Sequence, residues 1–154
     1  MPFDRLVRAV DGWAARCGRD DVVAQIGPTD WTPSHIRWKR FVDPDEYLDY
    51  CRQADRLVAH AGTGSILTAL QMGKPILVMP RRASLRETRN DHQVATIERF
   101  RAMQGVEVAV DETELPLKLS EMTGDAYQPA IGRYAAPQLI DTIRRFIHGH
   151  DLPQ

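Results

Sequence analysis

Apolar residues follow a helical spacing in the first part of the chain and then fall into short runs. Residues 3–17 place apolar side chains at positions i, i+3, i+4 and i+7, and Gly18 follows, so the pattern predicts an amphipathic helix that ends there. The runs 22–26 and 36–42 predict two strands joined by a loop rich in turn residues. Asp43 precedes a proline and two acidic residues, which predicts the capped start of a second helix.

The segment 55–82 is the best-defined unit of the pattern, because strand, glycine turn, helix and strand follow one another without a break. Its two apolar runs, Leu57–Ala59 and Ile76–Met79, have the length of buried strands. An apolar period of 3.6 residues lies between them, and Gly73 is placed to end the helix. The segment therefore predicts one βαβ unit, whose first loop opens at the carboxyl edge of a parallel sheet.

The rest of the pattern continues the alternation of helix and strand. Asn90, with Gln93 three residues later, predicts the start of another helix, and residues 106–110 alternate as a last strand. The predicted fold class is α/β, a Rossmann-like parallel sheet with helices on both faces, in a single domain over residues 1–154. Beyond the last strand we expect a helix within 111–123, a loop over 124–136 and a final helix over 137–148.

Composition and net charge argue against several classes of function. The formal net charge is −1 and the isoelectric point is about 6.5, which argues against bulk nucleic-acid binding. Cys17 and Cys51 do not form a metal-type pair, so we expect idle thiols in a reducing compartment rather than a metal or redox site. We also expect no signal peptide and no membrane span, since every apolar run falls short of the ~20 residues that a bilayer requires.

The turn over residues 60–65 is the candidate chemical site. Two glycines, two hydroxyls and a helix N-terminus would form a cradle of N–H groups that fits a phosphate. A turn of this kind is equally compatible with a tight strand-to-helix connection. The residue pattern alone leaves both interpretations open.

The sequence HAGTGSILTALQMGKPILVMPR, followed by Asn90-Asp91-His92-Gln93, resembles the C-terminal nucleotide-sugar-binding domain of family 28 glycosyltransferases. The resemblance extends over roughly residues 2–110. It is closest to the small catalytic subunits of two-component enzymes of this family. These include bacterial exopolysaccharide-type subunits and the eukaryotic subunit that adds the second N-acetylglucosamine of dolichol-linked chitobiose.

The resemblance implies the donor-binding half of a GT-B fold, with a UDP-sugar as donor and with neither a metal nor a cofactor. The diphosphate would lie on the glycine turn and the uracil against the end of the second strand. No general base is assigned, because GT-B enzymes build the acceptor side from another domain. The donor-binding residues that the resemblance assigns are Phe41, Val42, His60, Ala61, Gly62, Thr63, Gly64, Ser65, Arg81, Asn90, Asp91, His92 and Gln93.

Two departures from the family pattern limit this assignment. Thr68 stands where the peptidoglycan enzyme of the family has a glutamate that binds ribose, so we expect another residue to take that role. Family members also place an apolar strand and a Gly-Thr loop directly before the helix start that is here Pro2–Arg5. The first strand and half of the phosphate cradle are thus absent from this sequence, and we expect either that the protein begins upstream of Met1 or that this chain manages without its first strand.

Residues 81–89, which we call the arginine loop, contain four arginines and one acid, Glu87. A solvated loop, a diphosphate contact, an anionic lipid contact and an acidic partner surface all remain open for it. His60 ends a predicted buried strand, where a bond to a local backbone group is favoured over a catalytic role. His92 falls in the first turn of a helix, where the dipole disfavours its cation.

The favoured function is the donor-binding and catalytic subunit of a two-component inverting glycosyltransferase. The expected partner is a membrane-anchored subunit that binds a lipid-linked or polysaccharide acceptor and holds this chain at the cytoplasmic face of the membrane. The helix predicted over 137–148 either docks on that partner or packs on its own sheet. The alternative is a non-catalytic nucleotide-binding or docking subunit, whereas an epimerase of this architecture would need a second domain.

Overall fold

The computed structural model describes residues 2–89, 93, 97, 98, 100–122 and 124. The predicted alternation of helices and strands is confirmed within these residues: β4 has the predicted bounds, β3 is one residue longer than predicted, and β1, β2 and β5 are shorter than the runs that predicted them. The final loop and helix predicted beyond Gly124 lie outside the described residues, and so does Val94 of the predicted helix after Asn90. The helices are α1 (Asp4–Cys17), α2 (Pro44–Gln53), α3 (Thr63–Met72) and α5 (Leu115–Glu121), the strands are β1 (Val23–Gln25), β2 (Arg37–Lys39), β3 (Leu57–His60), β4 (Ile76–Met79) and β5 (Val106–Val108), and η1 (Ala83–Leu85) is a 3-10 turn.

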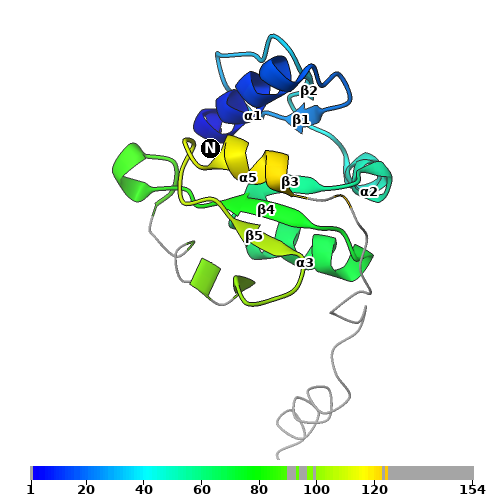
Figure 1. Cartoon of the computed structure of the whole chain (residues 1–154). Helices are drawn as coiled ribbons and strands as arrows, with labels where there is room; N and C mark the ends of the chain where they lie inside the picture. Colours follow the sequence, from blue (N-terminus) through cyan, green and yellow to red (C-terminus); the bar gives the residue numbers. More distant parts are fainter. Residues whose placement is uncertain (1, 90–92, 94–96, 99, 123, 125–154) are drawn as a thin grey trace, which may run out of the picture.

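The strands form two parallel sheets where the sequence predicts one. The larger sheet has the order β3-β4-β5, and β1 pairs only with β2 in the smaller sheet. The last strand ends at Val108, so Val110 does not continue the predicted alternation and is exposed. Figure 1 shows α1, β1 and β2 above the larger sheet and α3 below it.

The outer edge of β3 carries no neighbouring strand among the described residues. The amides of Leu57 and Ala61 donate to the β4 side, at Pro75 and Met79, so the amide of Val58 points to the other edge. All four residues of β3 are partly exposed, whereas all four residues of β4 are buried. β4 is therefore the centre of the larger sheet and β3 is an open edge.

Helices cover both faces of the larger sheet, as predicted. Leu77 and Met79 of β4 pack in a cluster with α1 and α5, while Ile76 and Val78 pack in a second cluster with α3. This alternation follows from the two-residue period of a strand, which sends successive side chains to opposite faces. The first cluster also contains Ile26, next to β1, so α1 joins the two sheets through one apolar core.

Polar contacts fix the start of α1 near the carboxyl ends of strands in both sheets. The Thr29 hydroxyl, just after β1, donates to Asp4 at 2.8 Å, and Nη2 of Arg5 donates to the carbonyl of Pro80, directly after β4, at 2.9 Å. The Arg40 side chain, just after β2, donates to the Thr29 carbonyl at 2.6 Å. The ends of β1 and β4 therefore contact the start of α1, and the end of β2 is joined to them through Thr29.

Local signals in the sequence produce the expected helix ends. Gly18 and Gly73 adopt the left-handed conformation with φ of 61° and 63°, which closes α1 and α3. The Asp43 side chain accepts the amide of Glu46 at 2.8 Å and caps α2. A further anchor, Asp11 of α1, is buried and accepts backbone amides at the entrance to β2, from Ser34, His35 and Ile36.

Candidate functional site

The N-terminus of α3 lies at the carboxyl edge of the larger sheet, directly after β3. Gly62 is the N-cap residue, and it supplies no side chain to bond the first-turn amides. The first turn also contains no acidic residue. The first-turn N–H groups have no preceding helical turn whose carbonyls could accept them, so they are left for water or an anionic ligand.

The two glycines of this turn have different structural roles. A Cβ built on Gly64 would meet no heavy atom within 4 Å, so this residue faces open space. A Cβ built on Gly62 would stand 2.1 Å from Cε1 of His60. Gly62 is therefore required by the packing of His60, whereas the bare backbone at Gly64 gives access to the helix terminus.

His60 lies at the end of β3 with its ring against Gly62. Its Nδ1 is buried and has no hydrogen-bond partner in the described part of the chain, so the expected bond to a local backbone group is absent at this atom. Burial lowers the pKa of His60, and the nearby charge of Arg81 lowers it further. The ring is consequently held neutral at the base of the glycine turn.

Arg81 follows β4 at the same edge, but its guanidinium is bound within the protein. Nη1 donates to the carbonyls of Glu87 at 3.0 Å and Pro2 at 3.4 Å, and the group lies 4.9 Å from the ring centroid of Phe3. Burial lowers the pKa of Arg81, while the charge of Glu87 opposes that shift. These contacts give Arg81 a structural role at the site that the sequence did not reveal.

Gln93 is brought to this edge as the sequence predicted. Its side-chain oxygen accepts the backbone amide of Arg81 at 3.0 Å, so the oxygen that was expected to meet a sugar hydroxyl already has a partner. The contact fixes the position of Gln93 beside the end of β4. Asn90, Asp91 and His92, which the sequence places in the same site, lie outside the described residues.

Phe41 and Val42 follow β2 in the smaller sheet. The Phe41 side chain is 67% exposed, which leaves an aromatic face available to a ligand. The Val42 amide, however, donates to the side-chain oxygen of Gln25 at 3.0 Å. The structure thus leaves Phe41 accessible and gives the Val42 amide a partner within the protein.

Tyr47 of α2 lies beside the glycine turn, a position that the sequence did not indicate. Burial raises the pKa of its hydroxyl, and hydrogen bonding with Ser65 and Thr68 of α3 partly offsets that rise. The three hydroxyl-bearing residues therefore cluster at the first turns of α3. Only the packing of α2 beside α3 reveals this, since the sequence signal at Tyr47 is that of a helix start.

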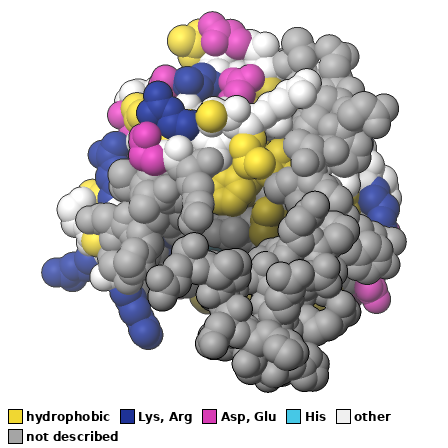
Figure 2. All heavy atoms as spheres, turned by 90° about the horizontal axis from the view of Figure 1, so that it is seen from below, with side chains coloured by type: hydrophobic (Ala, Val, Ile, Leu, Met, Phe, Trp, Pro, Cys, Tyr) yellow, Lys and Arg dark blue, Asp and Glu magenta, His cyan; other side chains and the backbone are white. Residues whose placement is uncertain are grey.

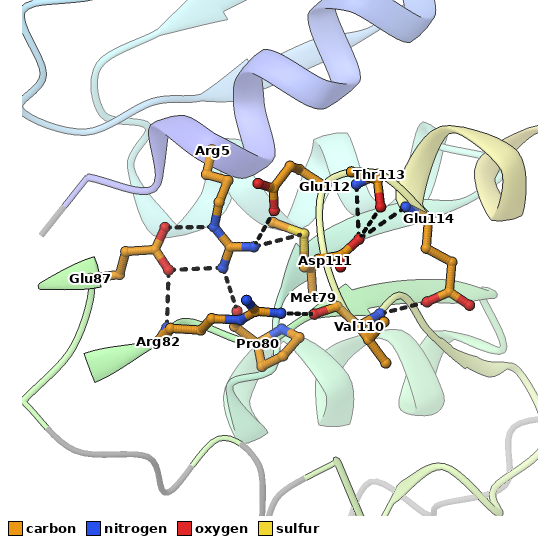
Figure 3. Close-up of polar contacts among 10 residues, drawn as sticks. All are labelled: Arg5, Met79, Pro80, Arg82, Glu87, Val110, Asp111, Glu112, Thr113 and Glu114. Atoms are coloured by element: carbon orange, nitrogen blue, oxygen red, sulfur yellow. Dashed lines mark hydrogen bonds and ion pairs between the residues drawn. The ribbon is translucent and has the colours of Figure 1, made fainter. Parts of the chain in front are cut away.

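Arg5 and Glu87 are a second feature that sequence reasoning missed. Nε and Nη2 of Arg5 donate to the two carboxylate oxygens of Glu87, each at 2.9 Å, and Figure 3 shows the paired geometry. Nη1 donates to Glu112 at 2.7 Å. Burial raises the pKa of Glu87, but bonds from Arg5 and from the Arg82 amide outweigh it and leave the pKa lowered. No sequence signal links residues 82 positions apart.

The described residues contain neither a metal-binding cluster nor a membrane-spanning helix. No group of three His, Cys, Asp or Glu side chains there is placed to hold a metal ion. No described helix has both the length and the apolar character to cross a membrane. Cys17 is exposed and Cys51 is buried, and neither forms a disulfide.

Comparisons with known proteins bear on the fold and the family of this chain. A solved structure titled "Crystal Structure Analysis of the Glycotransferase of kitacinnamycin" matches 94% of this chain with a TM-score of 0.56 and 23% sequence identity. The match covers 35% of that structure's chain, so the present sequence spans about a third of its length. No curated protein matches the chain. The model of the glycosyltransferase family 28 C-terminal domain matches residues 2–137, and the chain therefore belongs to this family.

Proposed function

We propose that this chain is the donor-binding and catalytic subunit of a two-component inverting glycosyltransferase that uses a UDP-sugar. The observation that carries the proposal is the uncapped N-terminus of α3, with Gly64 facing open space. Backbone N–H groups and the positive end of the helix dipole suit a diphosphate. Membership in the family 28 C-terminal domain supports the same chemistry.

In the proposed reaction, an acceptor hydroxyl oxygen attacks the anomeric carbon of the sugar while the bond from that carbon to the diphosphate breaks. The electron pair of the broken bond leaves with UDP, so negative charge grows on the diphosphate. The amides at Thr63, Gly64 and Ser65 stabilise this charge without reorganising, since the helix already orients them. The exposed ring of Phe41 offers a stacking surface for the uracil.

The acceptor and the general base belong, in this proposal, to a second polypeptide. The hydroxyl proton of the acceptor must pass to a base near that oxygen. We assign no base to the described residues at the glycine turn, where the Nδ1 of His60 is buried and has no hydrogen-bond partner among the described residues. We place the base on a membrane-anchored subunit that holds a lipid-linked or polysaccharide acceptor, with this chain peripheral at the cytoplasmic face.

Calorimetric titration of the purified chain with UDP tests donor binding. We expect Gly64→Val to weaken UDP binding at least tenfold, because the added side chain would enter the space above the helix terminus. Gly12→Ala is the control, since a Cβ there meets only the flexible end of Arg16 at 3.3 Å. Wild-type affinity in a folded Gly64→Val variant would refute the donor site.

Sugar transfer tests the enzyme class and the need for a partner. UDP-sugars would be supplied with a lipid-linked acceptor in membranes, with and without the product of a neighbouring gene. We expect transfer only when both polypeptides are present. Transfer by this chain alone in detergent would overturn the two-component proposal, and UDP binding without transfer under either condition would favour the non-catalytic alternative.

A further inference from the structure

We propose that the arginine loop, residues 81–89, docks on an anionic lipid surface. Arg82, Arg86 and Arg89 are exposed on this loop, and Leu85 between them is 52% exposed. Within the described part of the chain, neither Arg86 nor Arg89 forms an ion pair. Arginines that flank an exposed apolar side chain suit the interface between lipid phosphates and acyl chains.

The one acidic residue of the loop does not offset these charges. Glu87 faces the body of the protein, where Arg5 holds both of its oxygens, and only 12% of its side chain is exposed. Figure 3 shows Glu87 turned toward Arg5 and the backbone of Arg82. In the neighbouring segment Glu112 accepts a bond from Arg5, whereas Asp111 accepts a bond from the neutral Thr113 hydroxyl and keeps its charge near Arg82, which leaves Arg86 and Arg89 as the cations of the loop that carry the proposal.

The loop presents its outer residues in a fixed conformation. The Arg82 amide donates to Glu87 at 3.0 Å, and the Glu87 amide donates back to the Arg82 carbonyl at 3.2 Å. Arg86 has a φ of 57°, and its backbone N–H stabilises this conformation by donating a hydrogen bond to the Ala83 carbonyl at 2.9 Å. The loop is therefore ordered before it meets a surface, so docking costs little conformational entropy.

The shape of the loop favours a bilayer over an acidic protein. Figure 1 shows the loop projecting beyond the end of β4, and Figure 2 shows Lys and Arg side chains extending on that same side. A projecting loop with one exposed leucine can enter a lipid interface, whereas a stable protein contact needs about 800 Å² from each partner. Val110 adds an exposed apolar residue beside it, and Arg82 bonds the Val110 carbonyl at 3.1 Å.

The position of the arginine loop suggests a function for its contact with lipid. The loop follows β4 at the carboxyl edge that also carries the glycine turn after β3, so docking would hold the donor site near the membrane. This use rests on the proposed function, in which the acceptor is lipid-linked. The lipid contact itself can be tested without any sugar transfer.

Co-sedimentation of the full chain with vesicles is the test. Phosphatidylcholine vesicles with a minor share of phosphatidylglycerol would be compared with pure phosphatidylcholine vesicles, at low and high salt. We expect binding to the anionic vesicles only, at least tenfold weaker after Arg86→Glu or Leu85→Asp, and weaker at high salt. The matched controls are Arg37→Glu, on the exposed strand β2, and Leu117→Asp, on a side chain that is 61% exposed.

Absence of binding to anionic vesicles would overturn the proposal, and so would equal losses in the loop variants and their controls. Capture of an acidic protein that Arg86→Glu abolishes, together with no vesicle binding, would assign the loop to a protein partner instead. Calorimetry with UDP on the Arg86→Glu variant separates this inference from the proposed function. We expect unchanged UDP binding there, because Arg86 lies outside the glycine turn.

Discussion

The ring of His60 lies directly against the backbone of Gly62: a Cβ on Gly62 would stand 2.1 Å from Cε1 and 2.7 Å from Nδ1 of that ring. The sequence suggested that both glycines of the turn make room for a ligand. In the structure, one of them makes room for a side chain of the protein. The two glycines should therefore respond differently to the same substitution.

We expect Gly62→Ala to lower the free energy of unfolding by about 1–3 kcal/mol, because the ring or the turn must shift to admit the methyl group. Gly64→Ala should raise it by about 0.5–1 kcal/mol, since alanine is the better helix residue and no atom lies within 4 Å of the new Cβ. Urea denaturation measures both. Equal effects of the two substitutions would contradict the assigned packing.

His60 should make stability depend on pH. Its pKa in the folded state lies below the ordinary value of 6.5, because burial and Arg81 disfavour the cation. The unfolded chain therefore binds a proton at higher pH than the folded chain, and the stabilisation present above pH 6.5 is lost as pH falls below it. His60→Gln should reduce that loss, with a difference of at most about 1.4 kcal/mol per pH unit. Identical pH profiles for the two proteins would show that His60 titrates normally.

The ion pair of Arg5 and Glu87 should contribute more to the free energy of unfolding than the pair of Arg5 and Glu112. Glu87→Gln leaves Arg5 facing a neutral amide at a place where both side chains are 12% exposed, so we expect a loss of about 2 kcal/mol or more. Glu112→Gln changes a side chain that is 44% exposed and should cost less than about 1 kcal/mol. Denaturation curves for the two variants test this order, and the reverse order would contradict it.

Hydrogen exchange should reveal the open edge of β3. The amide of Val58 points away from β4, whereas the amide of Ala59 points toward it in the parallel pairing. We expect Val58 to exchange well before Ala59, its neighbour in the same strand, because water reaches an unpaired edge. Equal protection of both amides would show that another strand covers this edge.

The sequence by itself determined most of the local structure. Gly18 and Gly73 end their helices and Asp43 begins α2, because each acts on backbone groups only a few residues away. The same holds for the βαβ unit over β3, α3 and β4, whose apolar periods and glycine turn are contiguous. The glycine turn is therefore recognisable as the candidate site from its local residue pattern.

Only the tertiary structure decided how the distant parts of the site are connected. The pairs Arg5 with Glu87, Tyr47 with Ser65 and Gln93 with the Arg81 amide join elements that sequence spacing does not relate. Such contacts arise when helices and strands pack around a common core, and their energies depend on burial and distance, which periodicity cannot supply. The division of the strands into two sheets has the same origin. A strand can pair with more than one neighbouring strand, and its own sequence does not specify which neighbour it will have.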